Sequence, residues 1–325
     1  MSAMRKVQII GAGQLGSRHL QSLKSLKEPL SISVVDPNEA SLQVARERYD
    51  GIGGENHPVS YGAEIRAAES PWDLVIVATN SNVRREIIQK LLSTSKVKNL
   101  ILEKILFSSP EDYEAVDQML RESRTRAWVN CCMRQMPIYR KIRDTVSGSR
   151  IHLDISGSQF GLITNAIHYF DYLAFLTGET HIRVETLGLD REVIPSKRKG
   201  FLEMNGVLTG YTANGSSSRL TCFPSGNLPL IVQIHAPTHR FIVRESEGKA
   251  WATSEAEGWK WSEIEAKIPF QSKMTAELAQ EIFSNGECSL TTLGESIEIH
   301  RSLLNPLREH LAKSGIKTDL AYPFT

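Results

Sequence analysis

The chain has 325 residues, of which 41% are hydrophobic and 23% charged, and its formal net charge at pH 7 is +1. This balance is typical of a globular protein, and the length favours two domains because single cores rarely grow beyond about 250–300 residues. The near-neutral charge supplies no field of one sign to hold nucleic acid or a membrane surface, so we expect neither as a partner.

The termini and the four cysteines place further bounds on the protein. The apolar run near the N-terminus is too short for a signal segment or a membrane span. No two cysteines form a C-x-x-C pair, which disfavours a metal site built on thiolates. We therefore expect a cytoplasmic protein with reduced thiols and no metal.

Apolar strands alternate with helices through the first part of the chain. We expect strands at residues 5–10, 31–36, 73–79, 99–104 and 126–132, and helices from the first glycine turn to about residue 26 and at 37–49, 83–92 and 109–123. Such alternation is typical of a parallel sheet with helices on both faces. We predict a doubly wound Rossmann domain over residues 1–128, within an α/β protein.

A glycine-rich turn, "GAGQLG", follows the first strand. In this context Gly11 permits a tight turn, Gly13 lets a pyrophosphate approach the backbone, and Gly16 lets the helix pack on the sheet. Asp36 ends the second strand, where it would bind the ribose diol and repel a 2′-phosphate, so the sequence favours NAD over NADP. The predicted phosphate-binding residues are Gly11, Ala12, Gly13, Gln14, Leu15 and Gly16. The alternative is a turn that binds nothing.

Two further strands end in polar residues at the same edge of the predicted sheet. Ligands of such sheets lie outside the carboxyl ends of the strands. We therefore expect Thr79 and Asn80, after the third strand, and Glu103 and Lys104, after the fourth, to line the cofactor crevice. For Lys104 the alternative is a solvated lysine at a strand end.

Residues 129–325 are predicted to form a second domain. Strands are expected at 150–158, 182–190, 202–210, 218–223, 230–236 and 240–246. Several alternate apolar and polar residues, as antiparallel strands with one solvated face do. Two helices close the chain, and Pro306 should kink or restart the second one.

The stretch "LITNAIHYFDYLAFL", from Leu162 to Leu176, reads as a helix on which Thr164, His168 and Asp171 share one face. His168 is either an acid/base group, which its ordinary pKa suits, or a surface imidazole paired with Asp171.

Basic residues elsewhere in this domain have two readings. Lys197 and Arg198, in "PSKRKGF", either belong to a solvated loop or meet an anionic group of a substrate. Arg134 is expected to face the substrate crevice.

Together, "VQIIGAGQLGSRHL", "VVDPN", "VIVATNSNVRREI", "LEKIL" and "NAIHYFDYLAFLTGE" resemble the glucose–fructose oxidoreductase/inositol dehydrogenase/rhizopine-catabolism (Gfo/Idh/MocA) family. The resemblance implies a Rossmann domain followed by a domain on an open, mostly antiparallel sheet, which often carries dimer or tetramer contacts. It implies that Lys104 lies beside the nicotinamide and the reacting hydroxyl, and that His168 is an acid/base on the same oxygen.

The sequence departs from the family pattern at three positions. Ile105 replaces a proline, often cis, so the turn that presents Lys104 is expected to differ. Arg84 replaces a histidine that often begins a helix. Thr164 replaces the acid that precedes the catalytic histidine, which leaves Thr164 and Asn165 to position the substrate.

The resemblance implies an NAD-dependent oxidoreductase that transfers hydride between nicotinamide and a hydroxyl or keto carbon of a sugar, polyol or nucleotide sugar. Two alternatives stay open. The first is an NAD-binding sensor or partner subunit without turnover, and the second is an enzyme that oxidises transiently and recycles its NAD.

Overall fold

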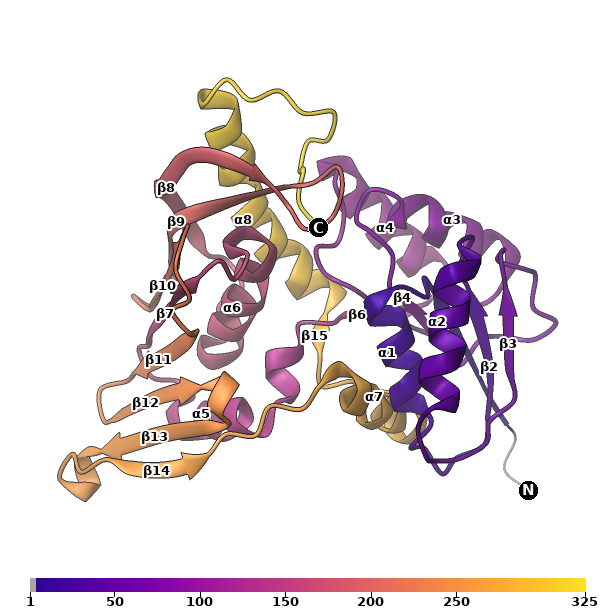
Figure 1. Ribbon diagram of the computed structural model, residues 1–325, viewed down its shortest axis with the longest axis horizontal. Helices are drawn as coiled ribbons and strands as arrows, with labels where there is room; N and C mark the ends of the chain where they lie inside the picture. The colour runs from indigo at the N-terminus through magenta and orange to yellow at the C-terminus, as the bar shows by residue number, and fades with distance from the viewer. Residues whose placement is uncertain (1–3) are drawn as a thin grey trace. The chain divides into compact units, whose positions relative to one another are not determined.

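A mainly parallel sheet organises the first unit of the chain, which comprises the residues up to Asn130 and the segment Pro269–Leu293 (Figure 1). The structure is a computed structural model that describes residues 4–325. Its strand order over those residues is β15-β6-β5-β4-β1-β2-β3, and only the pair of β15 with β6 is antiparallel. The bounds are β1 Arg5–Ile10, β2 Leu30–Val35, β3 Val59–Gly62, β4 Leu74–Val77, β5 Asn99–Leu102, β6 Arg126–Val129 and β15 Thr291–Thr292.

The helices of this unit are α1 Gln14–Leu23, α2 Glu39–Asp50, α3 Arg84–Thr94, α4 Pro110–Glu122 and α7 Gln271–Asn285. The chain moves outward from β1 to β2 and in the opposite direction from β4 to β5. Because parallel crossovers are right-handed, α1 and α2 cover one face and α3 and α4 the other. Helix α1 also packs on α7, and both contribute to one apolar core with the central strands. The reversal between β1 and β4 is the switch point at which such sheets bind ligands.

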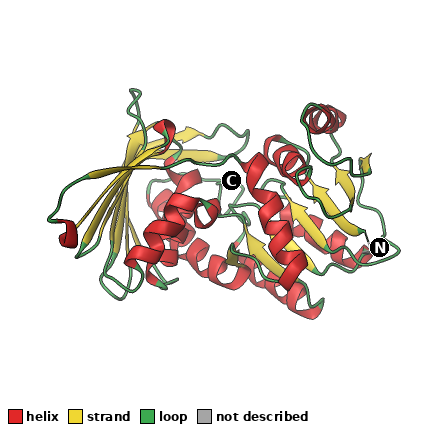
Figure 2. Cartoon of the chain, turned by 90° about the horizontal axis from the view of Figure 1, so that it is seen from below, coloured by secondary structure: helices red, strands yellow, loops and turns green. Residues whose placement is uncertain are grey.

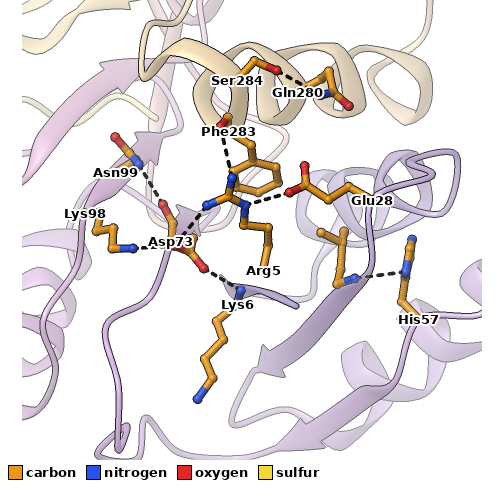
Figure 3. A network of polar contacts seen from close by, with 11 residues as sticks. Arg5, Lys6, Glu28, His57, Asp73, Lys98, Asn99, Gln280, Phe283 and Ser284 are labelled. Atoms are coloured by element: carbon orange, nitrogen blue, oxygen red, sulfur yellow. Dashed lines mark hydrogen bonds and ion pairs between the residues drawn. The ribbon is translucent and has the colours of Figure 1, made fainter. Parts of the chain in front are cut away.

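Helix α7 returns to this unit late in the sequence, and Arg5 ties it to the sheet (Figure 3). The Arg5 guanidinium donates to Glu28 Oε1 at 2.8 Å and to the carbonyl oxygen of Phe283 at 3.2 Å. It also lies 5.3 Å from the centroid of the Phe283 ring. Below it, Asp73 accepts hydrogen bonds from the backbone N–H of Lys6 and from Lys98 Nζ. The first unit is therefore built from two distant parts of the chain.

The second unit, Cys131–Ile268 with Gly294–Thr325, is built on an open sheet. Within the described residues its strand order is β14-β13-β12-β11-β7-β10-β9-β8. All pairs are antiparallel except β7 with β10. The bounds are β7 His152–Ser158, β8 Arg183–Pro195, β9 Leu202–Tyr211, β10 Ser217–Phe223, β11 Ile231–His235, β12 His239–Arg244, β13 Lys249–Ser254 and β14 Ser262–Glu265.

Helices lie against one face of this sheet (Figure 2). They are α5 Pro137–Val146, α6 Leu162–Thr177 and α8 Leu293–Lys313, and short 3-10 turns span Cys132–Gln135, Glu245–Glu247 and Glu255–Glu257. Helix α6 packs on β9 and β10. A Cβ at Gly210 would lie 2.5 Å from Phe170 Cε1, so glycine allows the helix to approach β9 closely.

The predicted fold class is confirmed: a doubly wound parallel sheet precedes an open, mostly antiparallel one. Several elements differ from the predictions. Strand β6 ends at Val129, so Cys131 and Cys132 lie in the turn after it, and no disulfide bond joins any of the four cysteines. Helix α8 continues through Pro306 without a restart. The predicted boundary after residue 128 lies close to Asn130, but residues 269–293 return to the first unit.

Candidate functional site

The turn between β1 and α1 requires glycine at two of its three positions. Gly11 has a φ of +93°, and a Cβ there would lie 2.9 Å from the carbonyl oxygen of Ala78. A Cβ at Gly16 would lie 1.7 Å from the carbonyl oxygen of Gly11, so only glycine lets α1 pack so closely. Gly13 is exposed, and a Cβ there would meet nothing within 4 Å. Gly11 and Gly16 therefore serve the fold, whereas Gly13 leaves open space beside the backbone.

That space fits the phosphates of a dinucleotide. Gly13 precedes α1 without capping it by a side chain, and the first turn of the helix carries no acid. Uncapped N–H groups at a helix start favour a bound anion. Beside them, the side-chain oxygen of Gln14 accepts from Arg48 Nη2 at 2.7 Å, and Leu15 is half-buried.

Asp36 lies directly after β2 and is half-buried. Its Oδ2 accepts from the backbone N–H of Ala12 at 2.7 Å, and its Oδ1 from that of Asn38 at 2.8 Å. The carboxylate thus joins the glycine turn to the end of β2. A carboxylate has about four lone-pair sites, so two hydrogen bonds leave capacity for the hydroxyls of a ribose.

The segments after β4 and β5 lie at the same edge of the sheet as the glycine turn. Thr79 is half-buried, and its Oγ1 has no hydrogen-bond partner among the described residues; Asn80 is exposed. Lys104 is half-buried, whereas every other residue from 100 to 108 is buried. The replacement of the family's proline by Ile105 led us to expect a different turn after Lys104. The Lys104–Ile105 peptide bond is nevertheless cis, so this bond does not show the expected difference.

Glu103 faces the interior of the first unit rather than its edge. It is 3% exposed, and its Oε1 accepts from His19 Nε2 at 2.9 Å and from Asn130 Nδ2 at 2.7 Å. Burial opposes ionisation, but these hydrogen bonds and the electrostatic effect of His19 and, to a lesser extent, Lys104 outweigh it and lower the pKa of Glu103 to about 2. The placement favours a supporting role for Glu103 over the direct cofactor contact that the sequence predicts. His19 and Asn130 were not predicted, because their pairing is tertiary.

Helix α6 of the second unit is capped by a residue that the sequence did not single out. Gly161 precedes it with a φ of +77° and supplies no side chain. Glu203, from β9, accepts instead from the backbone N–H groups of Ile163 at 2.7 Å and Thr164 at 3.1 Å. A carboxylate at a helix N-terminus is favourable. It fixes the start of the helix that carries His168.

The predicted face of α6 divides into two parts. Thr164, Asn165 and His168 are half-buried, whereas Asp171 is buried. Arg134 binds Asp171 with two nitrogens: Nε lies 2.8 Å from Oδ2, and Nη2 lies 3.0 Å from Oδ1. Asp171 is therefore a buried partner of Arg134, and the acid/base role of His168 stays a prediction. The same contact favours a structural role for Arg134, whose predicted contact with substrate stays a prediction.

A cavity of about 360 Å³ lies at the N-terminus of α6, within the second unit. The turn between β8 and β9 contributes to its lining, and this turn is closed by a hydrogen bond from the N–H of Ser196 to the carbonyl oxygen of Phe201. Polar residues predominate in its lining, among them Gln159, Thr164, Asn165, Lys197, Arg198, Glu203 and Asn205. The four residues predicted to bind substrate from the helix and from the basic loop thus line one cavity.

Residues 5–131 match the family described as "Oxidoreductase family, NAD-binding Rossmann fold", GFO_IDH_MocA. These residues form a Gfo/Idh/MocA domain. The predicted family and its NAD cofactor are thereby confirmed at the level of the domain. Within the Gfo/Idh/MocA domain lie the glycine turn, Asp36 and Lys104.

Solved structures with the same fold include enzymes and a regulator. An oxidoreductase from Agrobacterium radiobacter in complex with NAD⁺, L-tartaric acid and magnesium is 16% identical, with a TM-score of 0.71 over 93% of this chain and 94% of that one. UDP-N-acetylglucosamine 3-dehydrogenase from Acidithiobacillus ferrooxidans is 13% identical, with a TM-score of 0.70 over 94% and 97%. The transcriptional regulator Gal80p from Kluyveromyces lactis is 14% identical, with a TM-score of 0.72 over 96% and 91%. At these identities the likeness concerns the fold alone.

Two further findings concern the curated proteins and the helices of this protein. The search of the curated proteins gave no match. Among residues 4–325, no helix combines the length and the apolar character needed to cross a membrane.

Proposed function

We propose that the protein is an NAD-dependent oxidoreductase that acts on a CH–OH or keto carbon of a sugar, polyol or nucleotide sugar. The observation that carries the proposal is Lys104, the one half-buried residue of an otherwise buried segment at the edge where the glycine turn and Asp36 also lie. Bound NAD would supply the hydride acceptor. The chain's own residues would hold the cofactor, orient the substrate and move a proton.

The proton chemistry is proposed for Lys104 and His168. Oxidation of an alcohol releases the hydroxyl proton, and the group that takes it needs a pKa near the working pH. Imidazole has an unperturbed pKa of about 6.5, and proximity to a positive nicotinamide ring would favour the neutral form of a lysine. Thr164 can hydrogen-bond a substrate hydroxyl but cannot carry a proton at neutral pH. Its proposed role, with Asn165, is to position the substrate.

The cavity at α6 is proposed to bind a substrate that carries an anionic group. Arg198 is half-buried and Lys197 exposed, and both line this cavity. Guanidinium and ammonium groups suit a carboxylate or a phosphate. A uronate or a nucleotide sugar would therefore use the loop, while hydroxyls of the same ligand would use Thr164 and Asn165.

NAD is proposed over NADP because Asp36 stands where the adenosine ribose would bind. Its carboxylate can accept hydrogen bonds from a diol, whereas a 2′-phosphate would be repelled. Titration of the protein with each dinucleotide tests this choice. NAD is expected to bind at least tenfold more tightly, and equal affinities would contradict the role of Asp36.

The function is tested with a panel of sugars, uronates and nucleotide sugars, scored by absorbance of NADH. Lys104→Met should abolish turnover and leave NAD binding intact. Lys197→Ala with Arg198→Ala should raise KM for the anionic substrate at least tenfold and spare NAD binding. Lys199→Ala is the matched control, because this lysine is exposed on the same turn and does not line the cavity. An unchanged KM in the double variant would exclude the anion site.

A second function, an NAD-binding sensor without turnover, is favoured by one observation. The fold of Gal80p, a transcriptional regulator, matches this chain as well as the dehydrogenase folds do. Dinucleotide binding without NADH formation on the whole panel would support the sensor. Substrate conversion without net NADH would instead indicate transient oxidation with recycled cofactor.

Assembly as a homodimer or homotetramer through the second unit's sheet is also proposed, and light scattering on the purified protein tests it.

A further inference from the structure

Arg84, the first residue of α3, is completely buried in the first unit. Its Nη1 donates to the carbonyl oxygen of Leu106 at 2.6 Å and also to that of Ile105. Its Nη2 donates to the carbonyl oxygen of Thr79. A buried cation is costly unless hydrogen bonds compensate it. Arg84 gains that compensation from the backbone of two separate segments.

These two segments form the edge at which the proposed chemistry occurs. Thr79 follows β4, and residues 105 and 106 directly follow Lys104 at the end of β5. A guanidinium is a planar fork with five donors, so it can hold carbonyl groups from both segments in one geometry. Arg84 therefore fixes the distance between the two segments.

Lys104 is consequently held from both sides along the backbone. On its N-terminal side the Glu103 carboxylate is anchored by His19 and Asn130. On its C-terminal side the carbonyl groups of residues 105 and 106 are anchored by Arg84. Further along, the hydroxyl of Tyr113 donates to the carbonyl oxygen of Phe107 at 3.2 Å.

We propose that Arg84 is a positioning residue for Lys104. It sets the path of the backbone on which the Lys104 side chain stands, and it does so without touching cofactor or substrate. The inference rests on the proposed catalytic role of Lys104 for its effect on turnover. A misplacement of about 1 Å can cost roughly 100-fold in rate, so loss of the clamp should act on kcat.

The test compares Arg84→Met and Arg84→Lys with Arg85→Met. Arg85 is the matched control, because its side chain is 44% exposed and pairs with Asp112 on the protein surface. The lysines of each variant are reductively methylated with ¹³C, and the signal of Lys104 is identified by its absence from Lys104→Met. Circular dichroism, the Kd for NAD, and kcat and KM on the panel substrate are measured in parallel.

Arg84→Met is expected to move or broaden the Lys104 signal and to lower kcat about 100-fold, while the Kd for NAD and KM change less than about threefold. Arg84→Lys should fall between it and the wild type, and Arg85→Met should match the wild type. The inference is overturned if Arg84→Met keeps the wild-type signal, or if Kd, KM and kcat all worsen in equal proportion. If Arg84→Met does not fold, Arg84→Lys decides by the same criteria.

The two proposals can fail separately. Absence of wild-type turnover on the whole panel would count against the proposed function alone. The Lys104 signal would still decide the positioning role, since its measurement needs no substrate. A signal that changes in the Arg84 variants but not in Arg85→Met supports the positioning role of Arg84. A signal that changes in none of these variants refutes it.

Discussion

Alanine should destabilise the protein at Gly16, whereas at Gly13 it should leave the stability almost unchanged. In Gly16→Ala the added methyl would lie 1.7 Å from the carbonyl oxygen of Gly11, so α1 must move by more than an ångström. Overpacking of this kind costs about 1–3 kcal/mol or more. In Gly13→Ala the methyl meets nothing within 4 Å, and the φ of −63° suits alanine. We expect the free energy of unfolding to change by no more than about 0.5 kcal/mol.

The same methyl should nevertheless weaken NAD binding, because it occupies the space that the pyrophosphate would use. Loss of one hydrogen bond to a charged group costs about 1.5–3 kcal/mol, which is roughly a 10- to 150-fold rise in Kd. Urea unfolding measures the stability of both variants, and calorimetric titration measures the affinity for NAD. A folded Gly13→Ala protein that binds NAD as tightly as the wild type would refute this account of the turn.

Two buried charges of the structure give further predictions. Asp171→Asn should destabilise the protein by about 3–5 kcal/mol, because it leaves the buried Arg134 uncompensated. Asp144→Asn, in an exposed pair with Arg143, should cost no more than about 1 kcal/mol, and equal losses in urea unfolding would contradict the difference in burial. Glu103 has a pKa lowered to about 2, so its contribution to stability is present above its unfolded pKa and is lost as the pH falls towards 2. The wild type should therefore exceed Glu103→Gln in unfolding free energy by its full amount at pH 5, and this difference should shrink steadily at lower pH. A difference that does not depend on pH would exclude an ionised Glu103 in the folded protein.

The parts of the fold that follow local patterns could be predicted. Apolar runs and the glycine-rich turn predicted β1 and the start of α1, since the residues that decide them are neighbours in sequence. The helix expected over residues 162–176 was likewise predicted from its own residues, and the structure has α6 over Leu162–Thr177. Strand β3 was missed because its residues are only half-buried or exposed and supply no apolar run.

The contacts that hold the site could not be predicted, because they join residues far apart in sequence. Glu203 caps α6 by accepting from the backbone N–H of Ile163, 40 positions earlier. Arg134 pairs with Asp171 across 37 positions, a contact that the sequence did not predict. Helix α7 joins the first unit through contacts such as that of Arg5 with Phe283. Residue type and spacing carry no information on such pairings.

The central claim is that Lys104 transfers the proton in an NAD-dependent oxidation. Its most direct test is the absorbance of NADH formed by the wild type and by Lys104→Met on the substrate panel, with NAD affinity measured on the same samples. The account predicts NADH formation by the wild type on at least one sugar or anionic sugar, and none by Lys104→Met at unchanged NAD affinity. Turnover by Lys104→Met at the wild-type rate would contradict it.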